Sequence, residues 1–407
     1  MNYNEAIEYI HSIPKFRRPL GNAQLARLLA VFDNPQDKLN VIHIAGTNGK
    51  GSTAAMLAEI MKRQGYKTGL FTSPFIEVFN ERIQINNKLI PNDELAQYTL
   101  RVKRAMEENE AYVSEFAFIT AVSFLYFYEN KCDYVILETG MGGKLDATNI
   151  VKNPRLCILT SISLDHMQFL GDTVEEIAKE KCGIIKFGVP VVSYPNNTVR
   201  DIIKETAEKM KSELVFAGNA KKTEDSFEYK GTQYKLSLKG EYQCKNAAVA
   251  LEACKMLNKY GIDISDKSIE EGLKNAAWMV RYEFIRDNLV IDGGHNSDGV
   301  HELVKSLKAD GRKIFAVTAM MADKSVEECI KEISECAERM YCTELDMPRC
   351  EKAETLKEYA DHDSMKAEII KNPVDAVNKA LSEADGDTLV AVCGSLYLAG
   401  EIRRKFK

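Results

Sequence analysis

The chain has 407 residues, of which 45% are hydrophobic and 28% are charged, a composition typical of soluble globular proteins. This length suffices for two or three domains, each with its own hydrophobic core. The formal net charge of −6 argues against a strongly basic surface, and therefore against nucleic acid as a partner.

The amino-terminal residues and the cysteines predict a protein of the reducing cytoplasm. Residues 1–10 contain two Glu and no apolar core of the signal-peptide type. The longest apolar stretch, 119–128, is about half the length that spans a bilayer. The ten cysteines form no Cys-x-x-Cys pair, so we expect free, mostly buried thiols and no membrane partner.

Residues 41–72 predict a strand, a turn, a helix and a second strand. Val41–Ala45 is rich in β-branched residues, Gly46–Gly51 is rich in glycine, and Ser52–Gln64 has a helical pattern. An extended run resumes at Lys67–Thr72. Such a βαβ unit implies parallel strands joined by a right-handed crossover.

Apolar, β-branched runs alternate with helical patterns up to about residue 260. The predicted strands are 134–137, 156–160, 189–194 and 214–216, and the predicted helices are 94–108, 114–128, 198–211 and 246–260. Residues 227–238 interrupt the alternation and predict an exposed β-hairpin around Lys230–Gly231. Strands buried on both faces and separated by helices predict an α/β fold with a doubly wound, mostly parallel sheet.

A second α/β series begins near residue 285. Its predicted strands are 288–291, 314–318, 340–343 and 388–393, and its predicted helices are 298–308, 325–339, 353–360, 373–384 and 395–405. We therefore predict an ATP-binding domain with a P-loop-type site over residues 1–282. A smaller, Rossmann-like domain would follow over residues 283–407.

The segment Gly46–Ser52 has the features of a phosphate loop. Its glycines let backbone amides face a phosphate, the following helix and Lys50 add positive potential, and the Ser52 hydroxyl can reach Mg²⁺. Only two residues separate Gly46 from Gly49, and Gly51 precedes Ser52, so the segment departs from the G-x-x-x-x-G-K-[ST] pattern. An ordinary glycine-rich turn is the alternative, which the order strand, loop, lysine, hydroxyl and helix disfavours.

Three further candidates follow predicted strands at their carboxyl ends, where ligands bind in open α/β sheets. Glu138 is well placed to hold a metal ion beside the phosphate loop. By pattern alone, Ser73 is a turn residue before Pro74, and His166 is a loop residue. Lys181, in a charged helical run, is by the same pattern a solvated lysine.

Short segments along nearly the whole chain carry a family resemblance. They are A-G-T-N-G-K-G-S (45–52), T-S-P (72–74), N-E-R-I (80–83), E-T-G-M-G-G-K-L-D-A-T-N (138–149), L-D-H (164–166), L-G (170–171), E-K-C-G-I (180–184), D-G-G-H-N (292–296) and G-S-L-Y-L (394–398). Each is weakly specific alone, but in this order they resemble the folylpolyglutamate and dihydrofolate synthases of the Mur ligase superfamily.

The resemblance implies roles for particular residues. It implies catalytic roles for Lys50, Glu138, His166 and Lys181. It implies ATP contacts at Gly46, Thr47, Asn48, Gly49, Lys50, Gly51, Ser52, Asn246, Arg281, Asp292 and His295. It implies metal ligands at Ser52, Ser73, Glu138, His166 and Lys181, the last as a carbamylated lysine. The implied cofactors are ATP and Mg²⁺ in two sites, and the resemblance allows K⁺.

The implied activity is ATP-dependent amide ligation. The carboxylate of a folate-type substrate would be phosphorylated to an acyl phosphate, and L-glutamate, held mainly by the carboxyl-terminal domain, would attack it. The resemblance also implies a monomer. The sequence does not distinguish an enzyme that adds glutamate to dihydropteroate from one that adds it to folate.

The chain also departs from the family pattern. Phe75 and Tyr242 stand where the family has His, Lys144 stands where it has Arg, and Met279–Val280 replace Pro-Gly before Arg281. Lysine loses the bidentate hydrogen bonding of arginine. Two alternatives stay open: a Mur ligase with a non-folate acceptor, and a nucleotide-binding protein that has lost catalysis. A cell-wall ligase is disfavoured, because we expect no room for a uridine-binding domain before residue 46.

Overall fold

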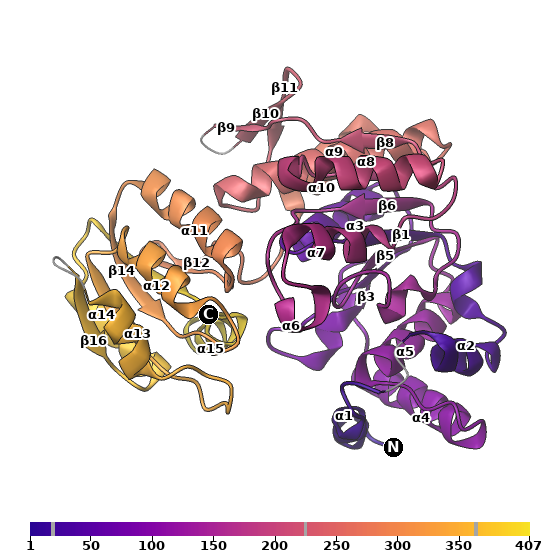
Figure 1. Cartoon of the computed structure of the whole chain (residues 1–407), viewed down its shortest axis with the longest axis horizontal. Coiled ribbons are helices and arrows are strands. Elements are labelled where there is room, and N and C mark those ends of the chain that lie inside the picture. Colours follow the sequence, from indigo (N-terminus) through magenta and orange to yellow (C-terminus); the bar gives the residue numbers. More distant parts are fainter. Residues whose placement is uncertain (18–20, 224–225, 362–364) are drawn as a thin grey trace. The chain divides into compact units, whose positions relative to one another are not determined.

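The computed structural model describes residues 1–17, 21–223, 226–361 and 365–407. The chain divides into two compact units, and each is described here by itself (Figure 1). The first unit comprises Met1–Ser237 and Lys245–Ala277, and the second comprises Leu238–Cys244 and Trp278–Lys407. The main division thus falls five residues before the predicted boundary at 282, and the short segment 238–244 belongs to the second unit.

An eight-stranded sheet of order β4-β3-β2-β5-β1-β6-β7-β8 organises the first unit. The strands are β1 (Val41–Ala45), β2 (Thr68–Phe71), β3 (Ile83–Ile85), β4 (Lys88–Leu89), β5 (Tyr134–Glu138), β6 (Leu156–Leu159), β7 (Val191–Ser193) and β8 (Leu214–Phe216). The six strands from β2 to β8 in this order are parallel, whereas β3 and β4 pair antiparallel at one edge. The central position of β1 places the loop that follows it in the middle of the carboxyl edge.

Helices cover both faces of this sheet. The helices of the first unit are α1 (Tyr3–Ser12), α2 (Ala23–Ala30), α3 (Lys50–Arg63), α4 (Asn92–Glu108), α5 (Glu115–Glu129), α6 (Met167–Leu170), α7 (Val174–Cys182), α8 (Arg200–Lys209), α9 (Glu241–Lys259) and α10 (Asp266–Asn275), with short 3-10 turns η1 (Pro35–Lys38), η2 (Phe79–Arg82), η3 (Ala147–Ile150) and η4 (Asn197–Val199). The first residues of α9, 241–244, belong to the second unit.

The two faces follow from strand order and from the cores. Val41 lies in the core formed with α1, α2, α4 and α5, and Ala45 lies in the core formed with α7 and α8. Successive residues of a strand face opposite sides of the sheet, so Val41 and Ala45, four positions apart, face the same side, and these helices share one face. The crossover from β1 to β2 runs across the sheet in the opposite direction, so a right-handed connection places α3 on the other face.

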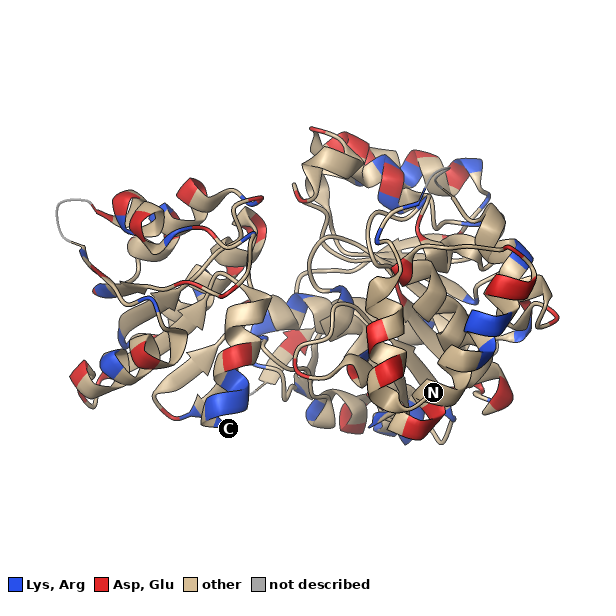
Figure 2. Cartoon of the chain, turned by 90° about the horizontal axis from the view of Figure 1, so that it is seen from below, with Lys and Arg blue, Asp and Glu red and all other residues tan. Residues whose placement is uncertain are grey.

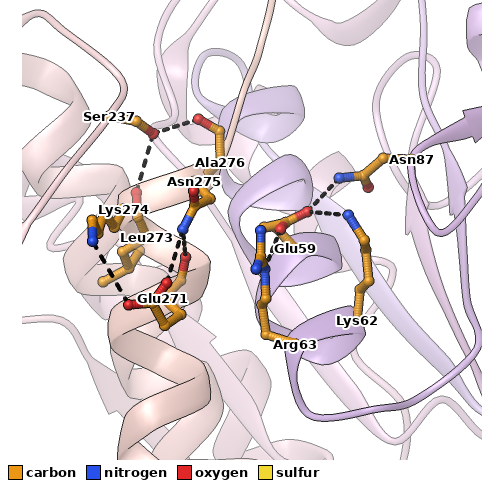
Figure 3. Close-up of polar contacts among 10 residues, drawn as sticks. All are labelled: Glu59, Lys62, Arg63, Asn87, Ser237, Glu271, Leu273, Lys274, Asn275 and Ala276. Carbon is orange, nitrogen blue, oxygen red and sulfur yellow. Dashed lines mark hydrogen bonds and ion pairs between the residues drawn. The ribbon is translucent and has the colours of Figure 1, made fainter.

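On that other face α10 packs tightly on α3, as Figure 3 shows. A Cβ on Gly272 of α10 would lie 2.6 Å from the Ile60 Cα, so only glycine permits this approach. Glu59 of α3 is 2% exposed and is held by Lys62, Arg63 and Asn87 (Figure 3). The helix that follows the candidate phosphate loop is therefore firmly anchored at its carboxyl end.

A small antiparallel sheet confirms the predicted hairpin. Its strands are β9 (Lys221–Lys222), β10 (Ser226–Tyr229) and β11 (Thr232–Lys235). Lys230 and Gly231 form the turn with positive φ angles of 50° and 81°, as two-residue hairpin turns require.

The second unit contains a six-stranded sheet of order β12-β13-β17-β14-β15-β16. Its strands are β12 (Glu283–Arg286), β13 (Leu289–Ile291), β14 (Lys313–Thr318), β15 (Arg339–Cys342), β16 (Lys366–Ile369) and β17 (Thr388–Cys393), and its helices are α11 (Ser297–Asp310), α12 (Val326–Ser334), α13 (Ala353–Ala360), α14 (Pro373–Glu383) and α15 (Leu396–Phe406). Among the described strands of this sheet only β12 pairs antiparallel, so the unit is of the predicted Rossmann-like α/β type.

The distribution of charged residues and the state of the cysteines agree with what the composition predicted. Acidic and basic residues are interspersed along the helices of both units, and basic residues gather in the last turn of α15 (Figure 2). All ten cysteines are free thiols. Among the described residues, no helix combines the length and the apolar character needed to cross a membrane.

Candidate active site

The loop between β1 and α3 has a backbone that only glycine can adopt at two positions. A Cβ on Gly46 would lie 1.8 Å from the Thr160 Oγ1, and Gly49 has a φ of +83°. The Thr47 amide donates to the Ser161 carbonyl at 2.6 Å, and its hydroxyl donates to the Ser163 carbonyl at 3.0 Å. The loop is therefore pinned to the segment after β6.

The remaining residues of this loop also lie where a phosphate loop needs them. Asn48 forms an isolated β-bridge with Ser161. Lys50, Gly51 and Ser52 form the first turn of α3, and the Gly49 N-cap has no side chain to occupy the helix amides. Positive potential at this helix terminus favours an anion.

Lys50 and Glu138 face each other beside the loop. The Lys50 Nζ lies 3.9 Å from the Glu138 Oε1 and donates to the Thr47 carbonyl at 3.0 Å. Glu138, at the end of β5, is only 3% exposed, and its Oε2 accepts the Ser73 amide at 3.1 Å. The structure thus brings together a cation, a carboxylate and the predicted serine from three different elements.

Lys181 is buried, and the prediction of a solvated lysine from its charged local pattern was wrong. It is 3% exposed, and its Nζ donates to the Gly46 carbonyl at 2.7 Å. Burial, and then the charge of Lys50, lower the pKa of Lys181 to about 7. In a large fraction of the molecules the Lys181 amine is therefore uncharged near neutral pH.

Two glycines explain how α7 comes this close. A Cβ on Gly143 would lie 2.6 Å from the Glu180 carbonyl oxygen, and one on Gly183 would lie 2.5 Å from the Lys144 Cα. The Lys144 amide also donates to the Glu180 carbonyl at 2.8 Å. The loop after β5 and the end of α7 are therefore in direct backbone contact, which fixes the position of Lys181.

Asn246 and His166 occupy different surroundings. A Cβ on Gly49 would lie 2.4 Å from the Asn246 Oδ1, so this buried amide of α9 lies directly against the phosphate loop. The His166 side chain is 43% exposed, and its Nε2 lies 3.9 Å from the Asp165 Oδ2. His166 has a positive φ of 51° and precedes α6 as its N-cap.

The second unit holds the remaining predicted residues. Asp292 is 3% exposed and accepts hydrogen bonds from the Tyr242 hydroxyl at 2.7 Å and from the Tyr282 and Gly294 amides at 2.8 and 2.7 Å. A Cβ on Gly293 would lie 2.6 Å from the Arg281 Nη1, and His295 Nδ1 lies 2.9 Å from the Gly293 carbonyl oxygen.

These contacts explain one departure in the sequence. Tyr242 stands where the family has His, and its hydroxyl supports Asp292. Burial raises the pKa of the Asp292 carboxyl, while the nearby charge of Arg281 and these hydrogen bonds oppose the rise. Arg281, Asp292 and His295 thus surround one short segment of the second unit, after β13.

The donors at the phosphate loop fit Mg²⁺ bound together with a nucleotide. Within the described ranges, no three His, Cys, Asp or Glu side chains gather so as to hold a metal ion. Mg²⁺ in nucleotide sites commonly takes only one or two carboxylates and completes its shell with phosphate oxygens and water. The buried Glu138 carboxylate and the buried Ser52 hydroxyl match that requirement.

Comparison with known proteins decides the family. Residues 44–254 match the Mur ligase middle domain, and residues 280–396 match the Mur ligase glutamate ligase domain. The chain belongs to the Mur ligase family. This Mur ligase is 34% identical to the dihydrofolate synthase/folylpolyglutamate synthase of Bacillus subtilis, over 100% of its own length and 99% of the relative's.

Solved structures share the fold of this Mur ligase over its full length. Escherichia coli FolC in complex with DHPP and ADP has a TM-score of 0.90 at 26% identity, covering 100% of this chain and 97% of that one. An FPGS–AMPPCP complex has a TM-score of 0.85 at 30% identity, covering 100% and 99%. The fold class predicted from the alternation of strands and helices is confirmed, as are the family and the class of ATP-dependent ligase predicted from the motifs.

Some residues that shape the site of this Mur ligase received no role from the sequence. The Glu81 carboxylate is 6% exposed and accepts the amides of Ile76, Glu77 and Val78 at 2.7, 2.8 and 2.8 Å. It thereby orders the segment that carries Ser73. The position of Glu81, two residues after the apolar pair Val78–Phe79 and two before Ile83, is a signal that could have suggested burial.

Phe75, the residue that replaces a family histidine, packs within the same segment. Its ring centroid lies 5.5 Å from that of Phe79. The Arg82 guanidinium lies 5.4 Å from each ring centroid, within the range of cation–π contacts. The aromatic side chain is therefore accommodated by apolar and cationic neighbours.

Proposed function

We propose that this Mur ligase joins the amino group of L-glutamate to the carboxylate of a folate-type substrate at the expense of ATP. The names of its relatives support this choice of substrates, and the convergence of Lys50, Glu138 and Lys181 on one glycine-rich loop is the observation that carries the proposal. A cation, a carboxylate and a partly neutral amine around a bed of backbone amides suit the transfer of a phosphoryl group.

The reaction has two balanced steps. A carboxylate oxygen of the folate attacks the γ-phosphorus of ATP, the bond to the bridging oxygen breaks, and ADP leaves with an acyl phosphate formed. The neutral amine of glutamate then attacks the acyl carbon, phosphate leaves with the former carboxylate oxygen, and the amine proton passes to solvent. Phosphorylation converts a poor leaving group into a good one.

The phosphate loop positions the nucleotide in this proposal. The amides of the loop and of the first turn of α3 bind the β- and γ-phosphates, and Lys50 neutralises charge that develops on the transferred group. Asn246 holds the loop from the side of α9. Bound Mg²⁺, held by Ser52, Ser73 and Glu138 and in a second site by His166 and Lys181, would supply further neutralisation of the phosphate oxygens.

Lys181 would serve this second site as a carbamate. Its neutral Nζ adds to CO₂, one proton leaves to solvent, and the amine becomes a carbamate that offers an anionic oxygen ligand. Burial and a pKa of about 7 support this modification, because only the neutral amine has a free electron pair. A hard oxygen donor also suits Mg²⁺ better than nitrogen does.

The second unit is proposed to hold glutamate and to add nucleotide contacts through Arg281, Asp292 and His295. These three side chains surround one segment after β13, and Arg281 carries the positive charge that an anionic ligand requires. A K⁺ ion and a monomeric state stay predictions from the resemblance.

An incorporation assay tests the proposed function. Purified protein is incubated with Mg-ATP and labelled L-glutamate, and dihydropteroate and tetrahydrofolate are offered in parallel. Label in a pteroyl product, with one ADP for each glutamate, supports the ligase, and the two acceptors separate the two activities. Nucleotide binding without incorporation into either acceptor would favour a non-folate acceptor or a protein without catalysis.

A further inference from the structure

His43 is a buried polar residue in the central strand of the first unit. It is fully buried within β1, whose other residues Val41, Ile42, Ile44 and Ala45 are all apolar. A polar group in such a position costs stability unless it forms hydrogen bonds. Its contacts therefore indicate what the side chain contributes.

A chain of hydrogen bonds leads from His43 to the loop after β5. The His43 Nε2 lies 2.8 Å from the Thr148 Oγ1, and that hydroxyl donates to the Asp146 Oδ1 at 2.6 Å. The Asp146 Oδ2 accepts the amides of Gly140 and Met141 at 3.0 and 2.9 Å. The side chain thus acts on residues about a hundred positions away in the sequence.

The direction of these bonds fixes the tautomer of His43. Thr148 has one hydroxyl proton, and it is used on Asp146, so the bond to His43 must be donated by Nε2–H. The His43 Nδ1 has no hydrogen-bond partner. Burial, and then the charge of Lys186, lower the pKa of His43 to about 3, so the ring is neutral at any working pH.

The loop after β5, which these hydrogen bonds hold, contacts both sides of the candidate site. It begins directly after Glu138, and its Lys144 amide donates to the Glu180 carbonyl of α7. The next residue of α7, Lys181, returns a hydrogen bond to the Gly46 carbonyl, three positions after His43. His43, the loop, α7 and the phosphate loop therefore form a closed ring of contacts.

We propose that His43 is a positioning residue, which holds the loop between Glu138 and α7 in place through Thr148 and Asp146. It thereby sets where the Glu138 carboxylate and the Lys181 amine lie relative to the phosphate loop. The inference rests on the proposed ligase function for its kinetic readout. It also predicts a change in backbone protection that does not depend on turnover.

Paired variants separate positioning from packing. His43→Gln keeps a donor at the position of Nε2, whereas His43→Leu removes it. Thr148→Ser keeps the hydroxyl that accepts from His43. Thr148→Val removes this hydroxyl and so breaks the same hydrogen bond at its acceptor. Ile42→Val is the matched control, because Ile42 is equally buried in the same strand but has no polar contact to lose.

Kinetics and hydrogen exchange are measured on each folded variant. We expect His43→Leu and Thr148→Val to lower kcat roughly tenfold, with KM for glutamate unchanged, since one hydrogen bond of about 1.4 kcal/mol corresponds to this factor. In the same two variants, hydrogen exchange of the Gly140 and Met141 amides should be at least roughly tenfold faster than in wild type. His43→Gln, Thr148→Ser and Ile42→Val should keep both properties near wild type.

The double variant His43→Leu/Thr148→Val should be no worse than the more affected single variant, because both break the same chain. The inference is overturned if both single variants keep wild-type kcat and amide protection and lose only melting temperature. If His43→Leu does not fold, the comparison of Thr148→Val with Thr148→Ser decides. Absence of product with the wild-type protein would instead reject the proposed function. The hydrogen-exchange measurement would still test whether His43 positions the loop.

Discussion

Replacing Lys50 by alanine is expected to remove catalysis and leave the fold largely intact. The Lys50 Nζ lies 3.9 Å from the Glu138 Oε1, with side-chain exposures of 16% and 4%. At an effective dielectric constant of about 20 this distance corresponds to an attraction of about 4 kcal/mol, much of which the desolvation of the two groups offsets. Loss of the cation should therefore destabilise the protein by only about 1–3 kcal/mol.

The effect on turnover should be larger than the effect on stability. In the proposed reaction charge develops on the γ-phosphoryl group beside Lys50, and removal of one preorganised group from such a site typically lowers kcat by roughly 10²–10³. Labelled glutamate incorporation at saturating Mg-ATP measures kcat, and thermal unfolding measures stability in the same preparation.

Lys62→Ala is the matched control for this prediction. Lys62 lies on the same helix, and its Nζ donates to the Glu59 carboxylate at 3.0 Å, at the end away from the phosphate loop (Figure 3). This variant should keep wild-type kcat. If Lys50→Ala keeps it too, the assignment of the phosphate loop is refuted.

Three further predictions concern the surroundings of the loop. The folded-state pKa of Lys181, about 7, lies below the ordinary lysine value of 10.5. Burying the charged amine therefore costs stability below pH 7, and this cost is relieved as pH rises from 7 toward 10.5. We therefore compare the stability of Lys181→Met with that of wild type in metal-free, CO₂-free buffer. The gain in stability of the variant over wild type should be larger at pH 6 than at pH 9, and a gain that does not depend on pH would contradict this. Gly143→Ala should lower the melting temperature and kcat, because its Cβ would meet the Glu180 carbonyl oxygen at 2.6 Å, whereas Gly386→Ala, with nothing within 4 Å, should change neither. Glu81→Gln should cost about 1–3 kcal/mol in urea unfolding, because an amide replaces one oxygen of a carboxylate that accepts three backbone amides, and an unchanged midpoint would argue against that role.

The elements that sequence patterns predicted are those whose signal is local. The β-branched run Val41–Ala45, the glycines after it and the helix from Lys50 are contiguous, so the phosphate loop could be recognised directly. Among the elements that were missed are the helices α1, α2, α6 and α10 and the strands β3, β4, β12 and β16. Strand β16, Lys366–Ile369, is an exposed edge strand with little apolar signal, and α10 is held by its tertiary contact with α3.

Residues whose surroundings are built from distant segments escaped local patterns. Lys181 lies among charged neighbours in sequence, yet Gly143 and Gly183 allow α7 to approach so closely that its amine is buried. His43 meets Thr148 across 105 positions, and no spacing rule connects them. The family resemblance supplied the role of Lys181, but the contacts of His43 came only from the three-dimensional structure.

The central claim is that ATP activates the acceptor carboxylate by phosphorylating it, and the oxygen atoms of that carboxylate test it most directly. A folate-type acceptor labelled with ¹⁸O in the reacting carboxylate is incubated with the protein, Mg-ATP and L-glutamate, and the released phosphate is analysed by mass spectrometry. The account predicts one ¹⁸O atom in each phosphate released with a glutamylated product. Glutamylated product accompanied by unlabelled phosphate would contradict it.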